Sequence, residues 1–300
     1  MEPYVLAVDL GGTKVEAALV STDGLRPGSR ARAATGRHAG PADLERAVRH
    51  VVRSALASAP AGTRPSAAGI GSAGPVDARA GSVSPINLPA SAGFPLRSVV
   101  ADAAGLALEE VELQLDGQCI ALAEYRRGAL RPYRYALGMV VSTGVGGGLV
   151  LDGRLVGGAS GNAGHVGQLL IGDGGGDVTT VEEIASGTSI VAWARSAGWT
   201  GDDGADLAAS YAAGHPVAVA AVERCGTAIG RAVLSAAALV DLQGVAIGGG
   251  FAKVTPDLFA VVERTIRRES PLRSIEVAVH PAQLGDDAPL LGAACLVLAA

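Results

Sequence analysis

The sequence Asp9-Leu10-Gly11-Gly12-Thr13-Lys14 separates two apolar runs, residues 4–8 and 15–20. Short apolar runs of this length favour strands, and residues 21–24 then supply turn-forming side chains. We therefore predict a hairpin whose two strands are joined by a glycine loop.

The loop of this hairpin carries residue types that suit a phosphate group. Gly11 and Gly12 have no side chain, so their main chain can approach anionic oxygens, while Thr13 and Lys14 add a hydroxyl and a cation. Asp9 is placed to hold a magnesium ion, directly or through water. The spacing is not that of a Walker A loop, and an ordinary hairpin turn remains the alternative interpretation.

A second glycine loop, residues 142–148, contains Thr143, Gly144 and Gly146. A dinucleotide-binding loop of the Rossmann type leads into a helix, whereas the apolar residues 149–151 indicate another strand here. We therefore predict a second hairpin that clamps a phosphate. Because a glycine loop between paired strands occurs twice, we expect the chain to have two similar halves.

A third glycine cluster includes Gly249 and Gly250 and follows the apolar run 245–247. Glycines at the end of a strand allow the close approach of a flat adenine or of a ribose. A plain turn between a strand and a helix explains the same residues equally well.

The composition bounds the class of protein. The chain has 300 residues, of which 49% are hydrophobic and 18% charged, so it can bury two sizeable cores and is not disordered. A net charge of -5 with scattered basic residues argues against nucleic acid or an anionic membrane as a partner. Three isolated cysteines and the absence of an apolar leader lead us to expect a cytoplasmic protein that does not cross a membrane.

The remaining elements alternate between strands and helices. Apolar runs and periodicity predict further strands at residues 68–71, 111–115, 137–142, 148–151, 154–156, 245–247 and 275–280. They predict helices at residues 42–59, 118–128, 181–197, 206–213, 217–240 and 256–268, and a closing helix from residue 289. The segment between the strands at 68–71 and 111–115 is rich in proline and glycine and is predicted to be a loop.

These motifs, in this order, resemble the ROK family (repressors, open reading frames, kinases) over essentially the whole chain. The residues that carry the resemblance are Asp9 to Lys14, Gly74-Pro75, Asn87-Leu88-Pro89, Asp116, Ser142 to Gly148, Gly164-His165-Val166-Gly167, residues 246–250 and residues 284–288.

The resemblance implies an α/β chain with an actin-like ATPase (ribonuclease H-like) fold, in two lobes with a central cleft. We expect residues 1–115 and 286–300 to form the smaller lobe and residues 116–285 the larger one. The implied activity is an ATP- and Mg²⁺-dependent kinase that phosphorylates the primary 6-hydroxyl of a hexose or aminohexose. A small-molecule sugar is then the partner, and we expect the protein to be a homodimer.

The resemblance also implies which residues contact the sugar. Asp116 is the expected general base, because a sugar hydroxyl becomes a good nucleophile when a carboxylate accepts its proton. Aspartate also caps helices well, and both roles can hold at once. The other expected sugar contacts are Gly74, Asn87, His165, Gln168 and Glu182. A loop histidine without a special role and a glutamate that complements a helix dipole remain alternatives for His165 and Glu182.

The sequence departs from the family pattern at several of these positions. Leu115 and Gln118 stand where the family has asparagines beside the aspartate, and His165 stands where it has a sugar-facing glutamate. The four zinc-ligand positions of the family hold other residues here, which are Gln168, Asp173, Gly175 and Thr180. We therefore expect no zinc site, and an unusual sugar such as 3-amino-3-deoxy-glucose (kanosamine) is conceivable.

Two other functions of the same family are weighed against the kinase. A sugar-binding repressor carries a helix-turn-helix domain before the first glycine loop, and eight residues precede Asp9 here. A non-catalytic sugar-binding protein is the second alternative, and the presence of both Asp9 and Asp116 argues against it.

Overall fold

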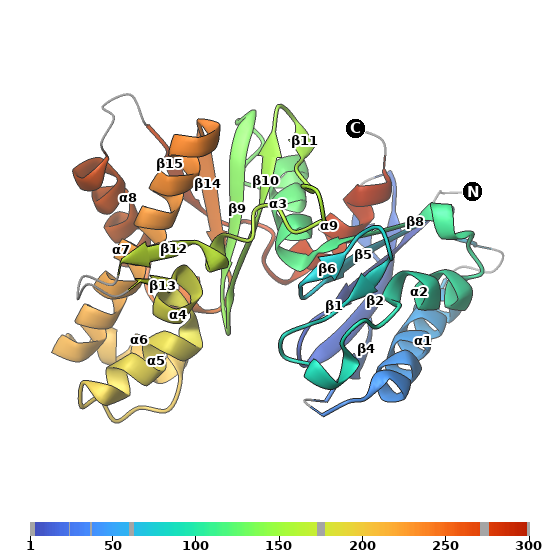
Figure 1. The fold of residues 1–300 in the computed structure, drawn as a ribbon, viewed down its shortest axis with the longest axis horizontal. Coiled ribbons are helices and arrows are strands. Elements are labelled where there is room, and N and C mark those ends of the chain that lie inside the picture. The colour runs from blue at the N-terminus through green and yellow to red at the C-terminus, as the bar shows by residue number, and fades with distance from the viewer. Residues whose placement is uncertain are drawn as a thin grey trace. The chain divides into compact units, whose positions relative to one another are not determined.

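The computed structural model describes residues 4–23, 25–36, 38–59, 63–172, 178–270 and 276–298 (Figure 1). The chain divides into two compact units. The first unit comprises residues 1–126, 155–163 and 286–300, and the second comprises residues 127–154 and 164–285. These units differ from the predicted lobes mainly because the helix that follows Asp116 and the segment 155–163 belong to the first unit.

The first unit is built on a six-stranded sheet in the order β3-β2-β1-β5-β8, with β4 also paired to β2. Its strands are β1 (Tyr4–Leu10), β2 (Lys14–Ser21), β3 (Arg26–Pro27), β4 (Ala31–Ala34), β5 (Ala68–Ser72) and β8 (Val111–Leu115). The predicted hairpin is present, with β1 antiparallel to β2 and Asp9 opposite Glu16. The strands β1, β5 and β8 are parallel, so their carboxyl ends share one edge of the sheet.

Helices α1 (Pro41–Ala57), α2 (Leu96–Ala104), α3 (Asp116–Arg127) and α9 (Ala288–Val297) pack around this sheet. Helix α9 lies so close to β5 that a Cβ on Gly69 would overlap the carbonyl oxygen of Ala293. The prediction of a loop between residues 71 and 111 is wrong in part, because α2 lies there. Leu96, Val99 and Val100 are buried at helical spacing, but the surrounding prolines and glycines obscured this short period.

Short elements complete the first unit. The two-stranded sheet β6 (Val76–Asp77) and β7 (Ser82–Val83) follows β5, and 3₁₀ turns occur at η1 (Pro89–Ser91) and η2 (Leu108–Glu110). A further 3₁₀ turn, η5 (Gly285–Asp287), precedes α9.

The second unit repeats the strand arrangement of the first. Its sheet has the order β11-β10-β9-β14-β15. The strands are β9 (Tyr135–Val141), β10 (Val145–Leu151), β11 (Arg154–Leu155), β14 (Gly244–Gly248) and β15 (Ala278–Pro281). As in the first unit, a hairpin (β9 with β10) is extended by two parallel strands, β14 and β15. The prediction of two similar halves is therefore confirmed at the level of sheet topology.

The described residues of the second unit form the helices α4 (Val181–Ala185), α5 (Gly187–Ser196), α6 (Gly204–Ala212), α7 (Pro216–Val240) and α8 (Asp257–Glu269). It also contains the hairpin β12 (Leu170–Gly172) with β13 (Val178–Thr180), and the turns η3 (Val166–Gln168) and η4 (Phe251–Lys253). One helix was predicted at residues 181–197, but two are present. Ser186 adopts an extended conformation and its hydroxyl caps α5 by accepting the amide of Ser189, so a new helix starts there.

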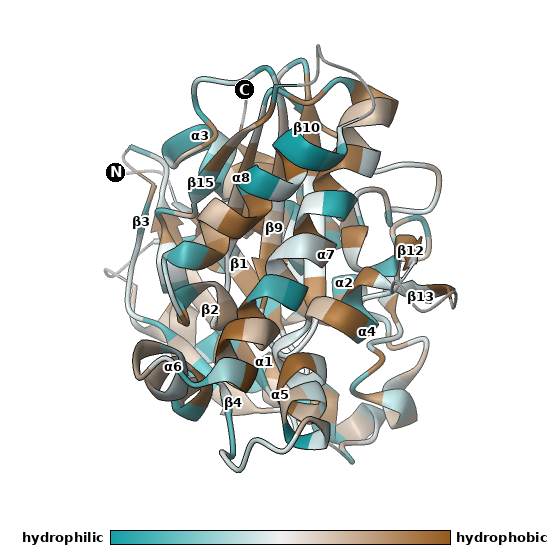
Figure 2. Cartoon of the chain, turned by 90° about the vertical axis from the view of Figure 1, so that its left-hand side faces the viewer, coloured by the Kyte–Doolittle hydropathy of each residue, from teal (hydrophilic) through white to brown (hydrophobic). Residues whose placement is uncertain are grey.

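Hydrophobic side chains form a separate core in each unit. Figure 2 shows that β9 is largely hydrophobic, whereas α7 and α8 carry both hydrophobic and hydrophilic residues. This pattern is typical of a buried strand covered by amphipathic helices. Among the described residues, no helix combines the length and the apolar character that crossing a bilayer requires.

Candidate active site

The glycine loop of the first unit is a tight turn that packs against Asn87. The amide of Gly11 donates to the carbonyl oxygen of Lys14 (2.9 Å), which closes the loop. A Cβ on Gly12 would lie 2.9 Å from the Cβ of Asn87, so no larger residue fits there. The structure thus brings one of the predicted phosphate-binding residues, Gly12, next to a predicted sugar contact, Asn87.

Two carboxylates with raised pKa values, Asp9 and Asp116, lie at the carboxyl edge of this sheet. Burial raises the pKa of Asp9 from 3.8 to about 7, and the charges of Asp116 and Glu16 add to that effect. Lys14 and Arg30 act in the opposite direction. Burial also raises the pKa of Asp116, from 3.8 to about 6, although the amide of Gly117 donates to its Oδ1 at 2.6 Å and lowers the pKa.

Asp9 fits a magnesium ion better than it fits a metal cage made of protein alone. Mg²⁺ is commonly held by one or two carboxylates together with waters and the phosphates of a substrate. In the part of the chain that the structure describes, no group of three or more histidine, cysteine or acidic side chains is arranged to hold a metal. A buried carboxylate whose pKa is raised by neighbouring negative charge is also one that a divalent cation would stabilise in its ionised form.

The cations around this site are held by acidic partners that the sequence did not single out. Glu16 is 3% exposed, and its carboxylate accepts Lys14 Nζ at 3.1 Å and also pairs with Arg32. Arg30 binds the Asp287 carboxylate and donates to the carbonyl oxygen of Asp286. The hairpin register was a usable signal for Glu16, because a residue opposite Asp9 follows directly from the predicted turn.

The remaining expected sugar contact of the first unit, Gly74, packs directly on Leu115. A Cβ on Gly74 would overlap Cδ2 of Leu115, and the peptide bond from Gly74 to Pro75 is cis. Gln118 is fully buried, and its Nε2 donates to the carbonyl oxygen of Ala163 at 2.7 Å. This side-chain amide is therefore engaged by the protein's own backbone.

The glycine loop of the second unit is organised by Glu182. The amide of Val145 donates to Oε2 of Glu182 at 2.7 Å, and a Cβ on Gly144 would lie 2.5 Å from the same oxygen. A Cβ on Gly146, by contrast, would meet no atom of the described chain within 4 Å, apart from its chain neighbours. The loop is therefore closely packed against Glu182 at Gly144, whereas the space beside Gly146 is open.

A cavity of about 800 Å³ lies beside this loop, entirely within the second unit. Two predicted nucleotide-binding residues, Thr143 and Gly250, line it. Gly249 does not line the cavity. Its φ of +96° favours glycine, and a Cβ there would overlap the backbone of Val141, so the chain turns tightly just before Gly250. Sequence analysis missed the other lining residues, which are Ser142, Gly187, Thr188, Val191, Ala192, Arg195, Asp202, Asp203, Gly204, Ala205, Ala208, Phe251, Lys253 and Val254.

The walls of this cavity come from segments that are far apart in sequence. They include the N-terminal parts of α5 and α6 and the turn η4. The hydroxyl of Thr188 donates to the carbonyl oxygen of Thr143 (3.0 Å), and this bond ties the start of α5 to the glycine loop. No local pattern in the sequence predicts the whole cavity, because the segments that line it are far apart in the chain.

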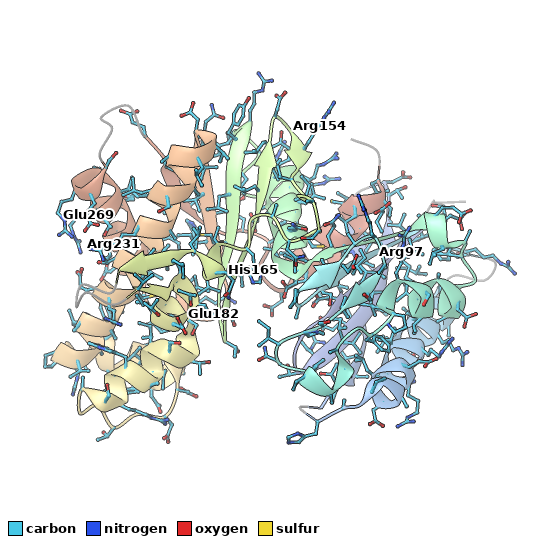
Figure 3. The ribbon with its side chains drawn as sticks, in the orientation of Figure 1. Arg97, Arg154, His165, Glu182, Arg231 and Glu269 are labelled. Carbon is cyan, nitrogen blue, oxygen red and sulfur yellow. The ribbon has the colours of Figure 1, made fainter. Side chains whose placement is uncertain are left out.

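The other predicted contacts of the second unit lie on neighbouring elements. His165 directly precedes η3, Glu182 lies on α4, and these two elements pack together (Figure 3). Gln168 ends η3 and is exposed, whereas Thr180 caps α4 by accepting the amide of Glu183. Asp173 and Gly175, the other two positions of the expected zinc-free segment, lie outside the described residues.

The comparison with known families agrees with the observed topology. The model of the ROK family matches residues 5–300. The chain belongs to the ROK family. The N-acetylmannosamine kinase of Citrobacter koseri is 36% identical over 299 residues, which cover 97% of both chains.

Two solved ROK structures are similar to this chain over nearly their full length. The ROK hexokinase of Thermus thermophilus superposes with a TM-score of 0.81 at 32% identity and covers 97% of both chains. The ROK glucokinase of Streptomyces griseus, solved with glucose and AMPPNP, has a TM-score of 0.80 at 27% identity and covers 98% of both chains. The predicted α/β, actin-like ATPase fold is confirmed, and this ROK protein is an ATP-dependent sugar kinase.

Proposed function

We propose that this ROK kinase transfers the γ-phosphoryl group of ATP to the primary 6-hydroxyl of a hexose or aminohexose, with Asp116 as the general base. The observation that carries the proposal is the pair Asp9 and Asp116. One carboxylate starts α3 with a pKa of about 6, close enough to neutrality to accept a proton. The other is buried opposite Glu16 and suits a magnesium ion.

Each protein group then has a chemical task. Asp116 accepts the proton of the sugar 6-hydroxyl while the oxygen of that hydroxyl bonds to the γ-phosphorus of ATP. The bond between the γ-phosphorus and the oxygen that leaves with ADP breaks in the same step. Mg²⁺ held through Asp9 would neutralise charge on the phosphates. Lys14 and the amides of the β1–β2 loop supply positive charge and donors for phosphoryl oxygens, and Glu16 holds the Lys14 ammonium in place.

The second unit supports the binding of the nucleotide. Its cavity of about 800 Å³ is large enough for an adenosine moiety, and Phe251 and Val254 give it apolar surface. Thr143 and Gly250 border this cavity, and the open space beside Gly146 leaves room for phosphate oxygens near the same loop. We therefore assign ATP to this unit, with Thr143, Gly144, Gly146, Gly249 and Gly250 as its main-chain contacts.

The choice of sugar rests on the residues that differ from the family pattern. The side chain of Leu115 forms no hydrogen bond, and His165 offers an imidazole in place of a carboxylate. The sugar hydroxyls therefore meet different donors and acceptors from those of the family pattern. Relatives at 34–36% identity are N-acetylmannosamine kinases. N-Acetylmannosamine is therefore the first sugar to test, followed by glucose, mannose, N-acetylglucosamine and 3-amino-3-deoxy-glucose.

A coupled assay of ADP release over this panel, with ATP and Mg²⁺, tests the proposal. We expect one aminohexose or hexose to stimulate ADP release strongly and its 6-deoxy analogue to give none. NMR of the product should show the new phosphorus coupled to the protons on carbon 6. Phosphorylation at another hydroxyl, or no sugar-dependent ADP release with any member of the panel, would contradict the proposal.

A further inference from the structure

The segment 156–163, here called the strap, leaves the sheet of the second unit after β11 and belongs to the first unit. Two of its glycines, Gly158 and Gly161, have φ values of +75° and +94°. A Cβ on Gly161 would also lie 2.9 Å from the Cβ of Ala78. The strap is therefore folded tightly onto the first unit in a conformation that only glycine adopts readily at these points.

Asn162 fixes one end of the strap to the loop after Gly74. Its Oδ1 accepts the amide of Val76 at 3.0 Å, and its Nδ2 donates to the carbonyl oxygen of Val76 at 2.7 Å. The same Nδ2 also contacts the hydroxyl of Ser160 at 3.1 Å. One side chain thus pairs with both backbone groups of Val76, as a neighbouring strand would.

Gln118 holds both ends of the strap, at Ala163 and at Val156, on the first turn of α3. Its Nε2 donates to the carbonyl oxygen of Ala163 at 2.7 Å and also lies 3.4 Å from that of Val156. Its Oε1 faces the amide of Leu115 at 3.4 Å. Because Gln118 is fully buried, losing these bonds would leave polar groups without partners in the protein interior.

We propose that Asn162 and Gln118 are positioning residues for phosphoryl transfer, because together they lock the strap between the Gly74 loop and the turn that carries Asp116. This inference rests on the proposed function of Asp116. The connection runs from Val76 through Asn162 to Ala163 and from there through Gln118 to the start of α3. Asp116 lies within that last turn, between the two ends of the Leu115–Gln118 contact.

The strap matters for catalysis because the base must stay within hydrogen-bond reach of the sugar hydroxyl. A misplacement of about 1 Å at a reacting group lowers a rate by roughly 100-fold. Gly74, an expected sugar contact, lies at the other end of the same connection, and its Cβ position is 3.8 Å from Oδ1 of Asn162. The strap therefore fixes the base and one wall of the sugar site by the same set of bonds.

The test compares apolar variants of similar shape with a matched control. Asn162→Leu and Gln118→Met remove the hydrogen bonds, and Gln114→Met makes the same change at a half-buried residue of the same unit, whose amide lies near Gly157 of the strap. Oε1 of Gln114 has no hydrogen-bond partner among the described residues, so this control should leave the kinetics unchanged. Steady-state ADP release is measured against both substrates with the best sugar.

We expect each of the two strap variants to lower kcat/KM for the sugar by about 10-fold to 100-fold, with KM for ATP within about twofold of wild type. Asn162→Asp and Gln118→Glu keep the acceptor and lose the donor, so they should fall between wild type and the apolar variants. A purely structural role would lower the amount of active enzyme without changing the sugar kcat/KM per active site. Unchanged sugar kinetics per active site would overturn the inference.

Hydrogen exchange on the wild-type protein gives a second readout that does not depend on the variants folding. The bound sugar should increase the protection of amides in peptides that cover residues 74–78 and 156–163, and ATP alone should not. Equal protection of these peptides with and without the sugar would overturn the inference. If sugar binding protects the strap but no sugar releases ADP, the proposed function fails while the link between sugar and strap stands.

Discussion

The two glycine loops share a sheet topology and differ in their surroundings. The loop of the first unit, residues 9–14, lies among charged groups, with Asp116, Glu16 and Arg30 acting on Asp9. The loop of the second unit, residues 142–148, is held by one carboxylate, that of Glu182, and borders a cavity lined largely by small and apolar residues. The same hairpin therefore borders a cluster of charged groups in one unit. In the other unit it borders a cavity whose wall is mostly small and apolar, with four charged residues, Arg195, Asp202, Asp203 and Lys253.

This difference shows how a repeated framework acquires two chemical tasks. Buried carboxylates with cations beside them have perturbed pKa values, which suits proton transfer and metal binding. A cavity that needs few charges suits a flat heterocycle and leaves the phosphates to main-chain amides. We expect mutations in the first loop's surroundings to change turnover and mutations in the second loop to change ATP affinity.

The largest effect is expected from Asp116→Asn. An amide of the same size cannot accept the proton of the sugar hydroxyl, so kcat should fall by roughly 100-fold to 10,000-fold. KM for ATP should change little, because the cavity proposed for the nucleotide belongs to the other unit. Above about pH 6 the thermal midpoint should not fall, because burial raises the pKa of Asp116 and a neutral amide avoids the cost of a buried charge. Steady-state ADP release and a thermal melt measure these quantities.

Glu112→Gln is the matched control, since Glu112 is an exposed acid on the strand that leads to Asp116. It should retain wild-type turnover. The wild-type enzyme should also lose kcat/KM below about pH 6, as Asp116 becomes protonated. If Asp116→Asn kept near-native turnover on the best sugar, Asp116 would not be the general base.

A smaller but measurable effect is expected on stability from Asp9→Asn. The folded-state pKa of Asp9 is raised from 3.8 to about 7, so the native state binds this proton more tightly than the unfolded state. The contribution of Asp9 to stability is therefore fully present below about pH 4 and is lost as the pH rises through about 7. Above pH 7 the variant should be more stable than wild type, by on the order of a few kcal/mol.

Urea unfolding without Mg²⁺ at pH 5 and pH 8 measures this difference, and Asp102→Asn on the exposed side of α2 is the control. The gain in stability for Asp9→Asn should be larger at pH 8 than at pH 5. An equal effect at both pH values would mean that burial of Asp9 does not raise its pKa.

Two alanine substitutions sharpen the contrast within the second loop. Gly144→Ala places a Cβ 2.5 Å from the Glu182 carboxylate and should destabilise the protein by about 1–3 kcal/mol. Gly146→Ala meets no described atom within 4 Å and should leave the thermal midpoint close to that of wild type. Because the new methyl group occupies the space assigned to phosphate, KM for ATP should rise about 10-fold, which is the cost of about 1.4 kcal/mol of binding.

Thermal melts and ATP kinetics on both variants give the answer. If Gly146→Ala leaves KM for ATP unchanged, the phosphates do not approach the loop at this point. If Gly144→Ala melts like wild type, the bond from Val145 to Glu182 does not organise the loop.

The smallest effect is expected from a chelator on the stability of the protein, because we expect the protein to bind no zinc. Gln168 is exposed, Thr180 is used as a helix cap, and neither side chain offers the sulfur or imidazole ligand that tetrahedral zinc prefers. We predict that elemental analysis finds no stoichiometric zinc and that a chelator leaves the thermal midpoint unchanged. The same chelator should abolish turnover by removing Mg²⁺ from Asp9, and added Mg²⁺ alone should restore it. One zinc per chain, or unfolding by the chelator, would contradict this prediction.

The sequence by itself determined the features that depend on contacts between near neighbours. Both hairpins follow from apolar runs on either side of a glycine loop, and the strand after Gly148 excluded a Rossmann loop. The breaker residues that hid α2 and the serine that divides 181–197 show the limit of such patterns. Residue spacing indicates a helical period. It does not indicate whether that period or a nearby breaker or capping residue determines the local structure.

Only the tertiary structure decided how the site is supported. Asn162 binds Val76 across 86 residues, and Gln118 binds Ala163 across 45, so no local pattern predicts either bond. The cavity likewise joins segments from Ser142 to Val254. The raised pKa values of Asp9 and Asp116 arise from burial by residues that are distant in sequence, and at Asp9 neighbouring negative charges raise the pKa further. Chemistry-bearing residues are therefore visible in the sequence, whereas their support and their acidity depend on packing between distant segments.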